Sequence, residues 1–230
     1  MAIDWLVILT SVLAVAPAAV ALLWGYSRYD GFFKDNVIFL YFMGGLIAGM
    51  GVAIFHAVLQ GNTLAFVLGI PLLEQFAKTI IVNRRKWQGQ PHAVFNGGAY
   101  GAGLGVMVSL WYSRGYLTPE TLGWIATAQI LGIAVGVTFL SIATGWVIGA
   151  SVRDHQPFKG TFLAALVGIP LAFFIEYWRS FPETWVAAAM AAYGLLLLVY
   201  GLRKVLPGGL SQESHQAMRQ KRRREIRGGH

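Results

Sequence analysis

Long apolar runs separated by short polar segments dominate the hydrophobic pattern of the chain. Seven runs stand out, over Trp5–Trp24, Val37–Leu59, Thr63–Val82, Val94–Tyr112, Leu122–Gly149, Gly160–Trp178 and Thr184–Leu202. A helix needs roughly 20 predominantly apolar residues to cross the hydrocarbon core of a bilayer. The pattern therefore predicts an all-α, polytopic membrane helical bundle of about seven transmembrane helices. The fifth run exceeds a single span, so we expect it to tilt, protrude or contain a break.

Composition supports a membrane protein and leaves no room for a separate soluble domain. Hydrophobic residues make up 56% of the 230 residues and charged residues 12%, whereas soluble domains carry about 25% charged residues. We expect two regions, a transmembrane bundle over residues 1–205 and a basic cytoplasmic tail over residues 206–230. The chain has no cysteine, which excludes disulfides, thiolate metal sites and a cysteine nucleophile.

The basic residues alternate between the two sides of the predicted bundle. Fifteen of the 18 follow the first, third, fifth and seventh runs: Arg28, Lys34, Arg84, Arg85, Lys86, Arg153, Lys159, Arg203, Lys204, Arg219, Lys221, Arg222, Arg223, Arg224 and Arg227. The other side has only Arg114 and Arg179, and Lys78 lies inside a run. The positive-inside rule then places the N-terminus outside and the C-terminus in the cytoplasm. We expect a prokaryotic plasma (inner) membrane protein.

The first run has one competing interpretation, because Ala14 to Ala19 offers the small residues of a signal-peptide cleavage site. Signal peptides begin with a positively charged region, and the only charged residue before this run is Asp4. We therefore predict that the first run is a retained transmembrane helix.

Glycines recur at four-residue spacing inside the runs, a pattern that lets helix backbones approach closely in lipid. The pairs and triplets are Gly45 and Gly49, then Gly97, Gly101 and Gly105, then Gly132 and Gly136, then Gly145 and Gly149. We interpret them as packing positions within the bundle. The alternative is a docking face for a partner subunit.

Charged and polar residues at membrane depth are the candidate functional residues. Glu74 and Lys78 are spaced to share one face of the third helix, where they could pair, and intramembrane charges favour a functional site. Asn96 and Tyr100 share a face of the fourth helix and could bond to the third across a short loop. His56 and His92 lie at different depths and should not share a metal.

Two of these segments resemble the PrsW family of intramembrane metalloproteases, within the superfamily of the CAAX prenyl endopeptidases. Residues 74–78, Glu-Gln-Phe-Ala-Lys, are similar to the family motif EExxK, and residues 96–105 are similar to DGxxYGxxxGxGF. The resemblance covers residues 66–110 and implies a helical bundle. For an active protein, the resemblance would imply a zinc site. Its candidate residues would be Glu74, Lys78, Asn96 and Tyr100, with Glu74 as the candidate ligand.

The departures from the family motifs weaken the expectation of activity. Gln75 replaces the second glutamate, residues 106–112 contain no glutamate, and residues 138–145 contain no histidine. A catalytic zinc usually needs three protein ligands and an open position for water. We therefore expect a non-catalytic relative, an accessory, scaffold or assembly subunit of a membrane complex. An active metalloprotease and a small transporter or channel are the alternatives.

The remaining expectations concern ligands and partners. We predict no cofactor, and zinc only if the protease alternative holds; a pigment or quinone contact through His56 lacks any diagnostic spacing. The tail residues Lys221, Arg222, Arg223 and Arg224 should contact anionic headgroups at the cytoplasmic face. We expect other membrane protein subunits as partners and do not expect nucleic-acid binding.

Overall fold

A computed structural model describes residues 5–29, 33–59, 61–116 and 123–208, and its long helices confirm the predicted all-α bundle. These helices are α1 (Trp5–Tyr26), α2 (Asp35–Val58), α3 (Thr63–Val82), α4 (His92–Tyr116), α5 (Trp124–Arg153), α6 (Pro157–Ser180) and α7 (Thr184–Tyr200). The shorter helical segments are η1 (Ser27–Tyr29), η2 (Arg85–Trp87), η3 (Gly201–Val205) and α8 (Leu206–Gly208). Seven helical segments in the described chain are long and apolar enough to cross a membrane. The predicted tail residues 221–224 lie outside the described residues.

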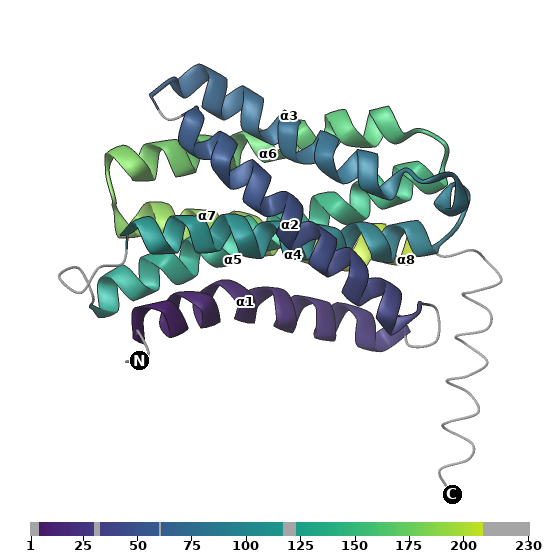
Figure 1. Ribbon diagram of the computed structural model, residues 1–230, viewed down its shortest axis with the longest axis horizontal. Helices are drawn as coiled ribbons and strands as arrows, with labels where there is room; N and C mark the ends of the chain where they lie inside the picture. Colours follow the sequence, from purple (N-terminus) through teal and green to yellow (C-terminus); the bar gives the residue numbers. More distant parts are fainter. Residues whose placement is uncertain (1–4, 30–32, 60, 117–122, 209–230) are drawn as a thin grey trace, which may run out of the picture.

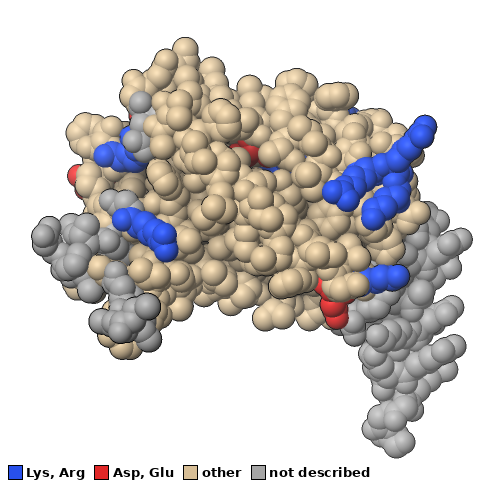
Figure 2. Space-filling model, in the orientation of Figure 1, with Lys and Arg blue, Asp and Glu red and all other residues tan. Residues whose placement is uncertain are grey.

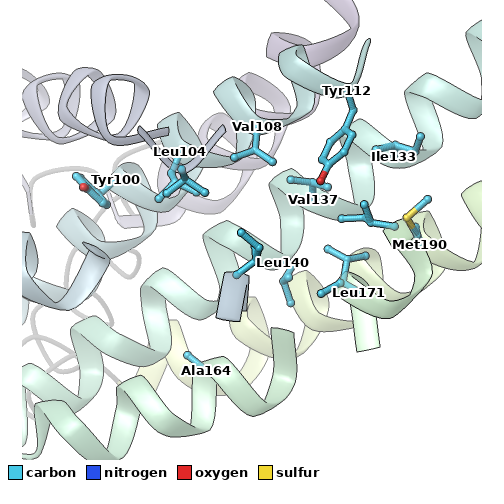
Figure 3. Close-up of a cluster of buried hydrophobic side chains, with 14 of the residues drawn as sticks. Tyr100, Leu104, Val108, Tyr112, Ile133, Val137, Leu140, Ala164, Leu171 and Met190 are labelled. Carbon is cyan, nitrogen blue, oxygen red and sulfur yellow. The ribbon is translucent and has the colours of Figure 1, made fainter. Parts of the chain in front are cut away.

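The centre of the bundle is the pair α4 and α5, around which the other helices pack (Figure 1). In the most apolar stretch of each helix, 89% of residues are buried in α4 and 83% in α5, against 28–44% in the others. Figure 3 shows how the core forms: Leu104 and Val108 of α4 lie near Val137 and Leu140 of α5, with Leu171 of α6 beyond them.

The order of neighbours differs from one sequence expectation. The short connection between α3 and α4 predicted that these two helices pack side by side. Instead α3 packs mainly against α6, and α4 packs mainly against α5 and α2. The hydroxyls of Thr79 in α3 and Thr161 in α6 lie 2.5 Å apart within this contact. Gly168 of α6 also lies against Pro71 of α3, so small side chains let these two helices meet closely.

The glycines at four-residue spacing lie where backbones of neighbouring helices approach. Gly45 and Gly49 of α2 face α4, and an added Cβ at either would overlap atoms of Tyr100, Leu104 or Met107. The remaining positions behave alike: Gly97, Gly101 and Gly105 face α5, Gly132 and Gly136 face α7, and Gly145 and Gly149 face α4. Their small size serves packing inside this chain, because only a residue without a side chain fits such contacts.

On the face shown in Figure 2, the surface is apolar along the bundle and charged mainly at its two ends. Large apolar side chains are exposed on the outer helices, among them Phe39, Ile47, Ile80, Phe162 and Leu196. A water-soluble monomer rarely exposes so much contiguous apolar surface. The protein is therefore an integral membrane protein.

Helix ends refine the predicted boundaries. The fifth run forms one continuous helix of 30 residues, without the break that was one of its three possible explanations. After α7 the chain makes a π-helical turn at η3, where Gly201 lies against the ring of Trp146.

The connections from α2 to α3 and from α6 to α7 lie at the same end of the bundle, on the left in Figure 1. The charge pattern predicts that this end faces outside, and we call it the predicted outer end.

Candidate functional site

Glu74 lies near the middle of α3, and its carboxylate meets a histidine from α2. The distance from Glu74 Oε1 to His56 Nε2 is 3.5 Å, and both side chains are almost fully buried. The sequence indicated Glu74 as an intramembrane charge but gave no reason to join it to His56. His56 and Glu74 meet because α2 ends beside the first half of α3, where the ring of Phe66 also packs against the imidazole.

The other imidazole nitrogen of His56 contacts a tyrosine of α4. His56 Nδ1 lies 2.5 Å from the hydroxyl oxygen of Tyr112. When Nδ1 is unprotonated it accepts a hydrogen bond from this hydroxyl, and Nε2 then carries the proton and points toward Glu74. Three helices thus contribute one polar residue each to the polar chain Tyr112–His56–Glu74 in the apolar interior of the bundle, in which His56 Nε2 and Glu74 Oε1 are in contact but not hydrogen-bonded.

A cavity of about 20 Å³ lies beside this chain. Glu74, His56 and Ser141 are its polar lining residues, and apolar side chains of α3, α4, α5 and α6 complete it. Within the described part of the chain, His56 Nε2 and Ser141 Oγ have no hydrogen-bond partner. A volume of roughly 10–15 Å³ and two to four polar partners suffice for a buried water molecule. The cavity therefore has the size and lining of a site for one water.

Lys78 is also buried, but it does not pair with Glu74 as the spacing allowed. Its ammonium donates hydrogen bonds to Thr144 Oγ1 at 2.8 Å and to Gln75 Oε1 at 3.1 Å. Thr144 in turn donates its own proton to the carbonyl of Leu140, so its oxygen is free to accept from Lys78. Among the described residues, the ion pairs within 4 Å include Glu74 with His56 but not Glu74 with Lys78. Neutral acceptors on α3 and α5 hold the ammonium instead.

Asn96 and Tyr100 do not join Glu74 at the cavity. Asn96 is buried, and its Nδ2 has no hydrogen-bond partner within the described structure. Tyr100 belongs to the apolar core, where its ring lies beside Gly44 of α2. Neither residue lines the cavity. The four candidate residues of the protease alternative are therefore not gathered around one cavity.

A hollow of about 590 Å³ opens at the predicted outer end, next to the polar chain. Its described lining residues are Trp111, Tyr112, Arg114, Tyr116, Trp178, Arg179 and Pro182. Arg179 Nη1 lies 2.7 Å from Glu176 Oε2, one turn earlier on α6. Tyr112 thus lines the hollow and contacts His56 as well.

The donor set around Glu74 does not fit a catalytic zinc. No group of three or more His, Cys, Asp or Glu residues that could hold a metal gathers among the described residues. His56 and Glu74 supply two candidate ligands, and the facing helix offers Ser141. Ser109 and Thr138, in the two segments that lack the family glutamate and histidine, contact each other at 3.3 Å.

In comparisons with protein-family models, curated proteins and solved structures, the chain matches none of them.

Proposed function

We propose that this protein is a non-catalytic, PrsW-like membrane protein that acts as an accessory, scaffold or assembly subunit of a membrane complex. The observation that carries the proposal is the incomplete donor set at Glu74, where one histidine and one carboxylate meet a serine. Three protein ligands are the usual requirement for catalytic zinc. The apolar perimeter and the basic tail supply surfaces for neighbouring subunits and for anionic lipid headgroups.

The position of Gln75 supports a structural role for this helix. Its side-chain oxygen accepts a hydrogen bond from Lys78, and its backbone carbonyl accepts one from Thr79. A second carboxylate at this position would have been available to activate a metal-bound water, which an amide cannot do. The residue that departs from the family motif is thus engaged in holding α3 and its buried ammonium together.

Native purification tests the proposal directly. The full chain, tagged at its C-terminus, would be purified in mild detergent from the membrane of its own host, after chemical cross-linking. We expect one or more other membrane proteins in a fixed ratio, absent when an equally expressed, unrelated polytopic protein is purified the same way. The proposal would be contradicted if the protein purified alone and cleaved a transmembrane peptide, and if the Glu74→Gln variant lost this activity.

The alternative of an active protease has one observation in its favour, the His56–Glu74 contact beside a cavity of water size. Metal analysis of the purified full chain separates the two functions. We expect zinc far below one ion per chain, with no difference between the wild type and Glu74→Gln. Zinc at one ion per chain in the wild type, lost on this substitution, would favour the protease.

A further inference from the structure

We propose that Tyr112 and His56 form a proton path between the hollow at the predicted outer end and the buried carboxylate of Glu74. This goes beyond the proposed function and does not depend on it. Tyr112 lines the hollow of about 590 Å³ and also lies 2.5 Å from His56 Nδ1. His56 Nε2 lies 3.5 Å from Glu74 Oε1. Chains of ionisable residues at membrane depth are the usual structural basis of proton relays.

The path conserves protons at every step. Water in the hollow donates a proton to the Tyr112 oxygen as the phenolic proton passes to His56 Nδ1. The proton on His56 Nε2 then moves to the Glu74 carboxylate. The net result is one proton gained by Glu74 and one lost from the hollow, with the imidazole left as its other tautomer. Release from Glu74 runs through the same bonds in reverse and restores the starting tautomer.

The small cavity supplies the missing link between the imidazole and the carboxylate. His56 Nε2 lies 3.5 Å from Glu74 Oε1 without forming a hydrogen bond, and Nε2 has no hydrogen-bond partner within the described chain. One water in the cavity of about 20 Å³ would reach His56, Glu74 and Ser141 together. Three polar partners are the usual number for a buried water. Such a water bridges the step that the protein atoms leave open.

The charges around Glu74 make its protonation consequential. Lys78, one turn along α3 from Glu74, is fully buried. From α6, Arg179 lines the hollow together with Tyr112 and forms an ion pair with Glu176. The face of α5 at the cavity contributes Ser141, and Thr144 lies beside Lys78; neither is ionisable. Neutralising Glu74 would leave the Lys78 charge without a counter-charge in the interior, so the proton and the packing of α3 should be coupled.

Infrared difference spectroscopy on the full chain in liposomes tests the path. The carboxylic C=O band of protonated Glu74 is assigned by its disappearance in Glu74→Gln. After a pH drop in the medium, the band should grow promptly in vesicles whose predicted outer ends face that medium. In vesicles of opposite orientation it should lag until the lumen acidifies. The proposal would be overturned if the band followed only the pH at the opposite end, or if no carboxyl band changed with pH. This test needs no substitution of Tyr112 or His56.

Two tyrosine variants sharpen the test. Tyr112→Phe keeps the ring and removes the relay hydroxyl, so the band should grow about 10²-fold more slowly, the scale on which positioned groups speed proton transfer. Tyr193→Phe is the matched control, because its hydroxyl donates to the carbonyl of Val167 and neither residue lines the cavity. Equal rates in the two variants would rule out Tyr112 as a carrier. Thermal unfolding of both variants checks that they are folded. If Tyr112→Phe does not fold, the orientation experiment on the wild type still tests the proposal.

Discussion

The α4–α5 interface and the surroundings of α3 both bury polar groups, but they accommodate them differently. Between α4 and α5, glycines such as Gly101 and Gly105 let backbone meet backbone, and small hydroxyls such as Ser109 and Thr138 contact each other. Around α3, the larger polar residues Glu74 and Lys78 occupy the interior and a cavity remains beside one of them. Close packing excludes water from the first region, whereas the second keeps room for it.

This difference indicates which region holds the fold together and which is available for chemistry. Van der Waals packing and close backbone approach drive helix association in lipid, where the hydrophobic effect contributes little. The α4–α5 interface supplies that packing. The α3 region instead contains groups whose burial is costly unless each is hydrogen-bonded. Polar groups kept in such a region, despite this cost, favour a role in binding water or protons.

The largest expected effect comes from breaking the glycine interface. In Gly101→Leu, the new side chain would overlap the backbone of Ser141, because even a Cβ has no room there. We expect the free energy of unfolding to fall by more than the roughly 1–3 kcal/mol of ordinary overpacking, so that little folded protein is recovered. Denaturation in mixed micelles, followed by tryptophan fluorescence, measures the change.

The matched control for this substitution is Gly51→Ala in α2, where an added Cβ meets nothing within 4 Å. A glycine inside a helix is less favourable than alanine by roughly 0.5–1 kcal/mol, so this variant should be slightly more stable than the wild type. If both glycine variants lowered stability equally, close approach at Gly101 would not be what distinguishes the α4–α5 interface.

The second effect lies at Lys78 and is of intermediate size. Thr144→Val removes an acceptor of the buried ammonium while keeping the shape of the side chain. A hydrogen bond to a charged group contributes about 1.5–3 kcal/mol, so we expect unfolding to become easier by that amount. Thr144→Ser retains the hydroxyl and should lose much less. Equal losses in Val and Ser would mean that packing, and not the hydrogen bond, stabilises this contact.

Much of the fold could be predicted from the sequence, because run length and charge alternation are local signals that the bilayer imposes on each helix separately. The seven spans followed from these signals, and so did the intramembrane position of Glu74. The pairing of helices did not follow. A short loop suggested that α3 lies beside α4, yet α3 packs mainly against α6. Loop length limits how far apart two helix ends lie, but side-chain packing selects the neighbours.

The candidate site was predicted only in part for the same reason. Spacing along one helix placed Glu74 and Lys78 on a shared face, but the partners of both come from other helices, His56 from α2 and Thr144 from α5. No pattern in the sequence links residues on separate helices. The available signal was that His56 is itself a polar residue within an apolar run, which could have been matched with Glu74 once the two helices were known to meet.

The smallest expected effect compares two serines of the α4–α5 pair: the Ser109 hydroxyl contacts Thr138 within the interface, and the Ser141 hydroxyl lines the cavity beside Glu74. Ser109→Ala leaves the Thr138 hydroxyl without its neighbour in the dry α4–α5 interface, and a lost hydrogen bond of this kind costs about 1 kcal/mol. Ser141→Ala removes a hydroxyl that bonds no group within the described chain, so the loss should stay below about 0.5 kcal/mol. Unfolding in mixed micelles measures both variants against the wild type.

The proposed water gives Ser141→Ala a second, distinct signature. That water would keep His56 and Glu74 as partners, so the carboxylic band of Glu74 should persist while its growth after a pH change slows. Ser109→Ala touches neither the cavity nor the path and should leave that rate unchanged. A stability loss at Ser141 as large as at Ser109, with an unaltered rate, would mean that the Ser141 hydroxyl serves packing and does not bind the proposed water.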